Sequence, residues 1–121
     1  MGVYNYADVM DRLSSETAIV SFVKANGENR VMLCTRDMRT ASLFCDNGIS
    51  GMASHDKRCN IKNGNIAVVD LAIGEGRSFN IDRVYNIEYL GSIDESGVND
   101  ALKRYLDAKH EASAEISMDN L

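Results

Sequence analysis

Five side chains in this 121-residue sequence are suited to binding an anion. They are Lys24, Arg30, Arg36, Arg77 and Ser78. An arginine can donate two parallel hydrogen bonds to one phosphate or carboxylate, and a lysine supplies a compact positive charge. A second interpretation stays open, in which these groups are solvated strand edges and Arg30 or Arg77 pairs with Asp70 or Asp82. Arg83 fits that second interpretation best, as a corner residue paired with a nearby acid.

Metal chemistry has weaker support in the sequence. Zinc prefers thiolate and imidazole ligands, which are present in Cys34, Cys45, His55 and Cys59. These four residues are separated by 11, 10 and 4 positions and contain no C-x₂-C pair. Three cysteines without an export signal indicate reduced thiols rather than disulfides. We therefore expect neither a bound metal nor a cofactor.

Catalytic motifs are also missing from the sequence. Neither His55 nor His110 has a readable partner for acid–base chemistry. The segment GEGRS (74–78) lacks the phosphate-loop pattern G-x-x-x-x-G-K-[ST], and GISGM (48–52) does not match G-x-S-x-G. We therefore expect a protein that binds rather than catalyses.

The first part of the chain predicts a helix followed by a hairpin. Residues 5–14 place apolar side chains at i, i+3, i+4 and i+7 after Asn5, a favourable N-cap. Asn26-Gly27 then separates two apolar, β-branched runs, which is the strongest short hairpin signal. If these two residues form a type I′ turn, Phe22 pairs with Val31, and we expect both side chains to be buried.

The second half of the chain predicts another hairpin and a terminal helix. Residues 37–64 are dense in turn formers and predict a long, partly irregular connection, in which ASLFC is either a short strand or a helical turn. Two strands are predicted at IAVVDLAI and RSFNI. A tight turn at Asp82-Arg83 and a final strand at VYNIEYL follow them. Residues 94–112 predict an amphipathic helix, and residues 113–121 a frayed tail.

These elements together predict an α+β protein with one domain, 1–121. Its centre is a small SH3-like antiparallel β-barrel over residues 17–90, with an N-terminal helix and a C-terminal amphipathic helix. Closure into a barrel would leave few open strand edges.

Charge and hydropathy narrow the classes of partner. The net charge is −5, but residues 21–62 carry seven Lys or Arg against four Asp or Glu. A protein that coats nucleic acid usually has a basic balance, so only a local basic face is expected here. No apolar run approaches the roughly 20 residues that cross a bilayer, which predicts no membrane association. The absence of a signal peptide favours the cytoplasm.

Two blocks of the sequence resemble a known family. FVKANGENRVMLCT (22–35) and VVDLAIGEGRSFNIDRV (68–84) are similar to the signature blocks of the small WYL-like, SH3-fold proteins of tailed bacteriophages. The matching residues are Phe22, Lys24, Gly27, Arg30, Met32, Cys34 and Thr35, and then Asp70, Arg77, Ser78, Phe79 and Asp82. Val69 and Gly76 stand where the family pattern has tryptophans, and Asn80 stands where it has a basic residue.

The resemblance implies an SH3-like barrel and a phage origin. Most members of the phage family have no assigned function, but related WYL domains of bacterial regulators bind nucleotides or nucleic acid. We expect a non-enzymatic phage accessory protein that binds a host protein, such as a defence or regulatory factor, in the cytoplasm of the infected bacterium. The alternative is a WYL-type module that binds a nucleotide or a single-stranded nucleic acid.

Overall fold

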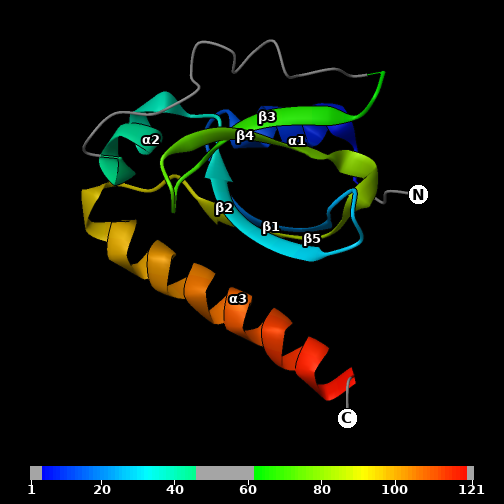
Figure 1. Cartoon of the computed structure of the whole chain (residues 1–121). Helices are drawn as coiled ribbons and strands as arrows, with labels where there is room; N and C mark the ends of the chain where they lie inside the picture. The colour runs from blue at the N-terminus through cyan, green and yellow to red at the C-terminus, as the bar shows by residue number, and fades with distance from the viewer. Residues whose placement is uncertain (1–3, 46–61, 120–121) are drawn as a thin grey trace.

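The structure is a computed structural model of the chain, in which residues 4–45 and 62–119 are described (Figure 1). It is an α+β fold with one five-stranded antiparallel sheet. The strands are β1 (Thr17–Val23), β2 (Asn29–Thr35), β3 (Asn65–Asp70), β4 (Glu75–Asn80) and β5 (Val84–Gly91). The helices are α1 (Tyr6–Leu13), α2 (Met38–Phe44) and α3 (Val98–Asp119), and two 3-10 turns, η3 (Ile81–Arg83) and η4 (Glu95–Gly97), precede β5 and α3.

The sheet is strongly curved but open, so it does not form the predicted closed barrel. Its strand order is β4-β3-β2-β1-β5, with β4 and β5 at the two edges. β2 pairs with β3 only through Cys34 with Asp70 and Thr35 with Val69. Because the pairing stops there, β2 separates from β3 towards the β1–β2 turn. In Figure 1 the β3–β4 hairpin lies over the concave side of β1, β2 and β5, and α3 crosses the convex side.

The β1–β2 hairpin forms where the sequence predicts it, but its register is shifted by one residue. Phe22 pairs with Arg30 rather than with Val31. Phe22 and Val31 are both buried, as predicted, but they lie on opposite faces of the sheet. Their burial therefore could not reveal the register, because both faces of this hairpin are covered.

The shifted register follows from the loop. The Lys24 N–H donates to the Glu28 carbonyl at 2.8 Å, which leaves three residues, 25–27, in the loop. Within this loop, Gly27 is the residue with a positive φ, 89°. A three-residue loop of this kind needs one left-handed residue, usually Gly, whereas a type I′ turn would also need Asn26 to be left-handed.

Two clusters of buried side chains cover the two faces of the sheet. The inner core fills the concave side and contains Val9, Leu13, Ala18, Val20, Phe22, Met32, Cys34, Ile66, Val68, Phe79, Ile81 and Val84. The outer core lies on the side of α2 and α3 and contains Ile19, Val31, Leu33, Ala41, Val69, Leu71 and Tyr105. Strands that are buried on both faces need apolar residues at successive positions, which explains the continuous apolar runs of β1 and β2.

Helix α1 connects two parts of the sheet. Asn5 is its N-cap, as predicted, and its side chain accepts a backbone N–H from the first turn at 3.1 Å. The Tyr6 hydroxyl donates to the carbonyl of Asn65 in β3 at 2.8 Å. The Tyr4 hydroxyl accepts the N–H of Ile87 in β5 at 3.2 Å. These contacts hold the start of α1 between β3 and β5.

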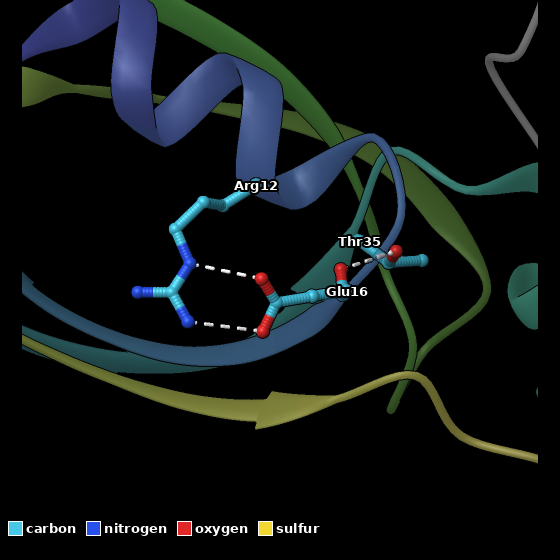
Figure 2. Close-up of polar contacts among 3 residues, drawn as sticks. All are labelled: Arg12, Glu16 and Thr35. Carbon is cyan, nitrogen blue, oxygen red and sulfur yellow. Dashed lines mark hydrogen bonds and ion pairs between the residues drawn. The ribbon is translucent and has the colours of Figure 1, made fainter.

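A polar cluster fixes the other end of α1. Figure 2 shows the Arg12 guanidinium donating two hydrogen bonds, of 2.8 and 3.1 Å, to the Glu16 carboxylate. The Thr35 hydroxyl donates to the Glu16 carbonyl at 3.0 Å, and the Arg12 guanidinium lies 3.5 Å from the ring centroid of Tyr89. The hydrogen bonds from Arg12 are the main reason that the pKa of Glu16 lies below its ordinary value. The cluster joins α1 to β2 and β5.

The structure selects the helical alternative for ASLFC and extends the last helix beyond its predicted end. Part of ASLFC continues a helix, α2, whose N-cap Asp37 accepts the backbone N–H of Arg39 at 3.1 Å. Much of the predicted 37–64 connection lies outside the described residues. The sequence predicts that the last helix ends at residue 112 and frays beyond it, but α3 extends to Asp119. The sequence after Val98 contains neither Gly nor Pro, so no residue in it interrupts a helix.

Candidate functional site: a cationic cleft

A cleft of about 370 Å³ opens between the end of the β1–β2 hairpin and β4. Four positively charged side chains line it: Lys24, Arg30, Arg77 and Arg83. Phe22, Met32 and Phe79 contribute apolar surface, and the residues that line the cleft include no acidic side chain. We call this site the cationic cleft. Its volume lies in the range of small-ligand sites, roughly 300–1,000 Å³.

Strand alternation explains why the cations meet. Side chains two positions apart on a strand point to the same face. In three places a cation lies two positions from a residue of the inner core, towards the open side of the sheet. The pairs are Phe22 with Lys24, Met32 with Arg30, and Phe79 with Arg77. Because β2 separates from β3 at this end, the core gives way to solvent, and the cations form the rim of the opening.

Three of the cations have acidic partners just outside the cleft. The ion pairs join Lys24 to Glu28 at 3.6 Å, Arg30 to Asp70 at 3.6 Å, and Arg77 to Glu75 at 2.7 Å. The first and third pairs are solvent-exposed on both sides. Exposed pairs of this kind typically contribute about 0–1 kcal/mol, so an anionic ligand can replace the acid at little cost.

Asp70 is the most buried acid of this group. It is 3% exposed, and its carboxylate accepts the backbone N–H of Ala72 at 3.1 Å. Burial is the main cause that raises the pKa of Asp70 above its ordinary value, while the N–H of Ala72 and the charge of Arg30 act in the opposite direction. Arg30 therefore has two roles, since it lines the cleft and also compensates a buried carboxylate.

The structure brings together four of the five side chains that the sequence singled out as anion-binding. Lys24, Arg30, Arg77 and Ser78 line the cationic cleft. Arg36 does not line it. The Arg36 guanidinium donates to the carbonyl of Ala67, and its backbone N–H donates to the carbonyl of Leu13. Arg36 thus contributes to the packing between the hairpins.

Arg83 belongs to the site, although the sequence pattern assigned it to a corner. It does lie on the corner, in η3, but its guanidinium donates to the carbonyl of Lys24 at 3.2 Å rather than to the predicted acid. Asn65 and Asn80 also line the cleft, and their side chains are joined by a 3.2 Å hydrogen bond. Neither asparagine was anticipated, because only the approach of β4 to the first hairpin brings them to the site.

The aromatic side chains of the cleft form its floor. Phe22 and Phe79 are 7% and 3% exposed, and their ring centroids lie 5.9 Å apart at an interplanar angle of 32°. Rings in this arrangement pack against each other and present little free face to a ligand. The cleft is therefore charged at its rim and apolar at its base.

The cysteines fall outside this site. Cys34 is fully buried in the inner core, and burial raises the pKa of its thiol. Cys45 lies at the end of α2, whereas His55 and Cys59 lie outside the described residues. Within residues 4–45 and 62–119, no three His, Cys, Asp or Glu side chains are grouped as metal ligands.

Comparison with known proteins identifies no relative. No protein-family model, no curated protein and no solved structure matches this chain. In the described part of the chain, no helix is both long enough and apolar enough to span a bilayer.

Proposed function

We propose that this protein is a non-enzymatic accessory protein of a tailed bacteriophage that binds a host protein through the cationic cleft. The partner is a defence or regulatory factor, and binding occurs in the cytoplasm of the infected bacterium. The observation that carries the proposal is the convergence of Lys24, Arg30, Arg77 and Arg83 on one opening whose lining includes no acidic side chain. The phage setting rests on the resemblance of residues 22–35 and 68–84 to the phage family.

The connectivity of the sheet supports an SH3-like barrel as the parent fold. β5 follows the corner η3 and returns to pair with β1, which also pairs with β2. A meander whose last strand returns to its first is the connectivity of a small barrel. In this chain β4 and β5 are the two edges of the open sheet, and β2 also leaves β3 at the end where the cationic cleft lies.

A nucleotide or a single-stranded nucleic acid is the second candidate ligand. Arginine forks suit phosphate, and the volume of the cleft suits a small ligand. Single-strand binding usually also requires exposed aromatic faces on which bases stack, worth about 1–3 kcal/mol per base. Phe22 and Phe79 are buried and pack against each other. This favours the acidic side chains of a protein over a nucleic acid.

Affinity purification from infected cells tests the proposal. Tagged protein is compared with two charge reversals, Arg77→Glu in the cleft and Arg39→Glu on α2. Both residues are exposed, so neither substitution disturbs the core, and both change the net charge equally. We expect wild type and Arg39→Glu to retain the same host protein, and Arg77→Glu to lose it.

Two outcomes would contradict this proposal. Equal recovery of the host protein by all three forms would remove the cleft from the binding site. Recovery of nucleotide or nucleic acid in place of protein would favour the second candidate. In that case the logarithm of the affinity should fall with the logarithm of salt by about 0.7 per phosphate contact.

A further inference from the structure

In the described part of the chain, no strand pairs with the outer edge of β4. β4 is the edge strand of the sheet and pairs only with β3 among the described residues. The Ile81 N–H donates to the Gly64 carbonyl at 2.8 Å, one position beyond the Asn65–Asn80 pair. In an antiparallel ladder, hydrogen-bonded and non-hydrogen-bonded pairs alternate. The backbone groups of Gly76, Ser78 and Asn80 therefore point outwards, away from β3.

The opposite edge of the sheet is less accessible. The N–H of Ile87 in β5 is already bonded to the Tyr4 hydroxyl. β5 also changes register twice along β1, between Thr17 and Ala18 and between Ser21 and Phe22, which makes it irregular. Irregular strands and covered amides protect an edge from pairing. Of the two edges, β4 is better suited to accept a strand.

The open edge of β4 and the cationic cleft belong to one surface. Arg77, Ser78, Phe79 and Asn80 line the cleft and occupy the last four positions of β4. A strand added beside β4 would lie about 4.8 Å away, and alternate side chains would face the cleft. On that side they would meet Arg77, with Lys24 and Arg30 across the opening. Carboxylates at alternate positions match this charge.

We propose that the partner contributes an extended acidic segment that pairs with the outer edge of β4 and directs alternate Asp or Glu side chains into the cationic cleft. This inference rests on the proposed function and specifies how the host protein is held. Backbone hydrogen bonds to Ser78 and its neighbours supply affinity, and the cations select carboxylates, as in other cases of strand addition. The incoming carboxylate replaces Glu75 on Arg77.

Fluorescence anisotropy with a defined peptide tests this binding mode. The probe is a labelled peptide of about seven residues that alternates Glu and Val, long enough to span β4. The comparison peptide is N-methylated at alternate residues, so that it keeps its charges but loses the N–H groups that pair with β4. We expect wild-type protein to bind the first peptide at least about tenfold more tightly than the second.

Two protein variants test the same contact from the other side. Ser78→Pro removes an N–H that points away from β3, a position at which an edge strand tolerates proline. Ser78→Ala removes the hydroxyl and keeps the N–H. We expect Ser78→Pro to weaken peptide binding about tenfold relative to Ser78→Ala. If Ser78→Pro does not fold, the comparison of the two peptides on wild-type protein decides the question.

Several results would overturn the inference. Equal affinity for both peptides would exclude strand pairing. If sedimentation shows that the protein associates with itself and that this association prevents peptide binding, the edge would be assigned to a second copy of the chain. If the peptide does not bind but Arg77→Glu still loses the host protein, the cleft remains the site and only strand addition is wrong. If the host protein is also retained by Arg77→Glu, the proposed function fails as well.

Discussion

Removing the Arg30 guanidinium should destabilise the protein by about 1–2 kcal/mol at neutral pH. Asp70 is 3% exposed, and its carboxylate lies 3.6 Å from the Arg30 guanidinium. Two unit charges at about this distance attract by about 1 kcal/mol in water and about 4 kcal/mol at an effective dielectric constant near 20. The lower part of that range applies, because the side chain of Arg30 is 35% exposed.

The cost of Arg30→Met should depend on pH. Burial raises the pKa of Asp70 above its ordinary value of 3.8. The folded protein therefore binds a proton at Asp70 more tightly than the unfolded chain does. The contribution of Asp70 to stability falls as pH rises from its unfolded pKa to its folded pKa. Loss of Arg30 raises the folded pKa further. The variant should thus be more destabilised at about pH 7 than at about pH 4, because the carboxyl is increasingly protonated as pH falls and then carries no charge for Arg30 to compensate.

Urea unfolding, followed by circular dichroism at both pH values, measures this dependence. Arg30→Lys is the matched control, because it keeps the charge and should retain most of the stability. The double variant Arg30→Met with Asp70→Asn should lose the pH dependence. An equal cost of Arg30→Met at both pH values would refute the electrostatic account and assign the loss to packing of the arginine side chain.

Three further predictions follow from the fold. Cys34, with the other two cysteines changed to Ser, should resist iodoacetamide in the native protein and react on unfolding; rapid native labelling would contradict its burial. Gly27→Ala should cost about 1–2 kcal/mol in urea unfolding because φ is 89° with no atom near the new methyl group, whereas Asn26→Ala should cost less; equal costs would favour the two-residue turn. The two hydrogen bonds from Arg104 lower the pKa of Glu88 in the folded protein. The resulting contribution to folding stability is present above pH 4.5 and is lost as pH falls through the folded pKa. Glu88→Gln should therefore flatten the acid side of the curve of stability against pH, and an unchanged curve would contradict this.

Local periodicity predicted most elements of the fold. The stripe of residues 5–14, the two hairpins and the corner at Asp82-Arg83 all depend on contacts between near neighbours, which the sequence displays directly. The hairpin register could not be predicted from the sequence in this way, because Asn26-Gly27 suits a two-residue turn and a three-residue loop alike. Alternation could not decide between the loops either, since both faces of β1 and β2 are buried.

The sequence singled out four residues of the candidate site but did not predict the shape of the site. Arg77 lies in phase with Phe79, so the sequence already placed it on the side of the core. The gathering of Arg77 with Lys24 and Arg30 depends on the point at which β2 separates from β3, after only two residue pairs. That separation is a tertiary feature with no local signal. Arg36 has the same side chain as the other arginines but lies elsewhere, bonded to a carbonyl of β3.

Chemical-shift mapping of isotope-labelled protein with the acidic peptide tests the cationic cleft most directly. The cleft account predicts that the amide signals that shift on titration belong to residues 76–80 of β4 and 24–30 of the first hairpin. It also predicts that Arg77→Glu removes these shifts, whereas Arg39→Glu leaves them unchanged. Shifts confined to α3 and the exposed face of β5 would contradict the assignment and place the binding surface on the opposite side of the sheet.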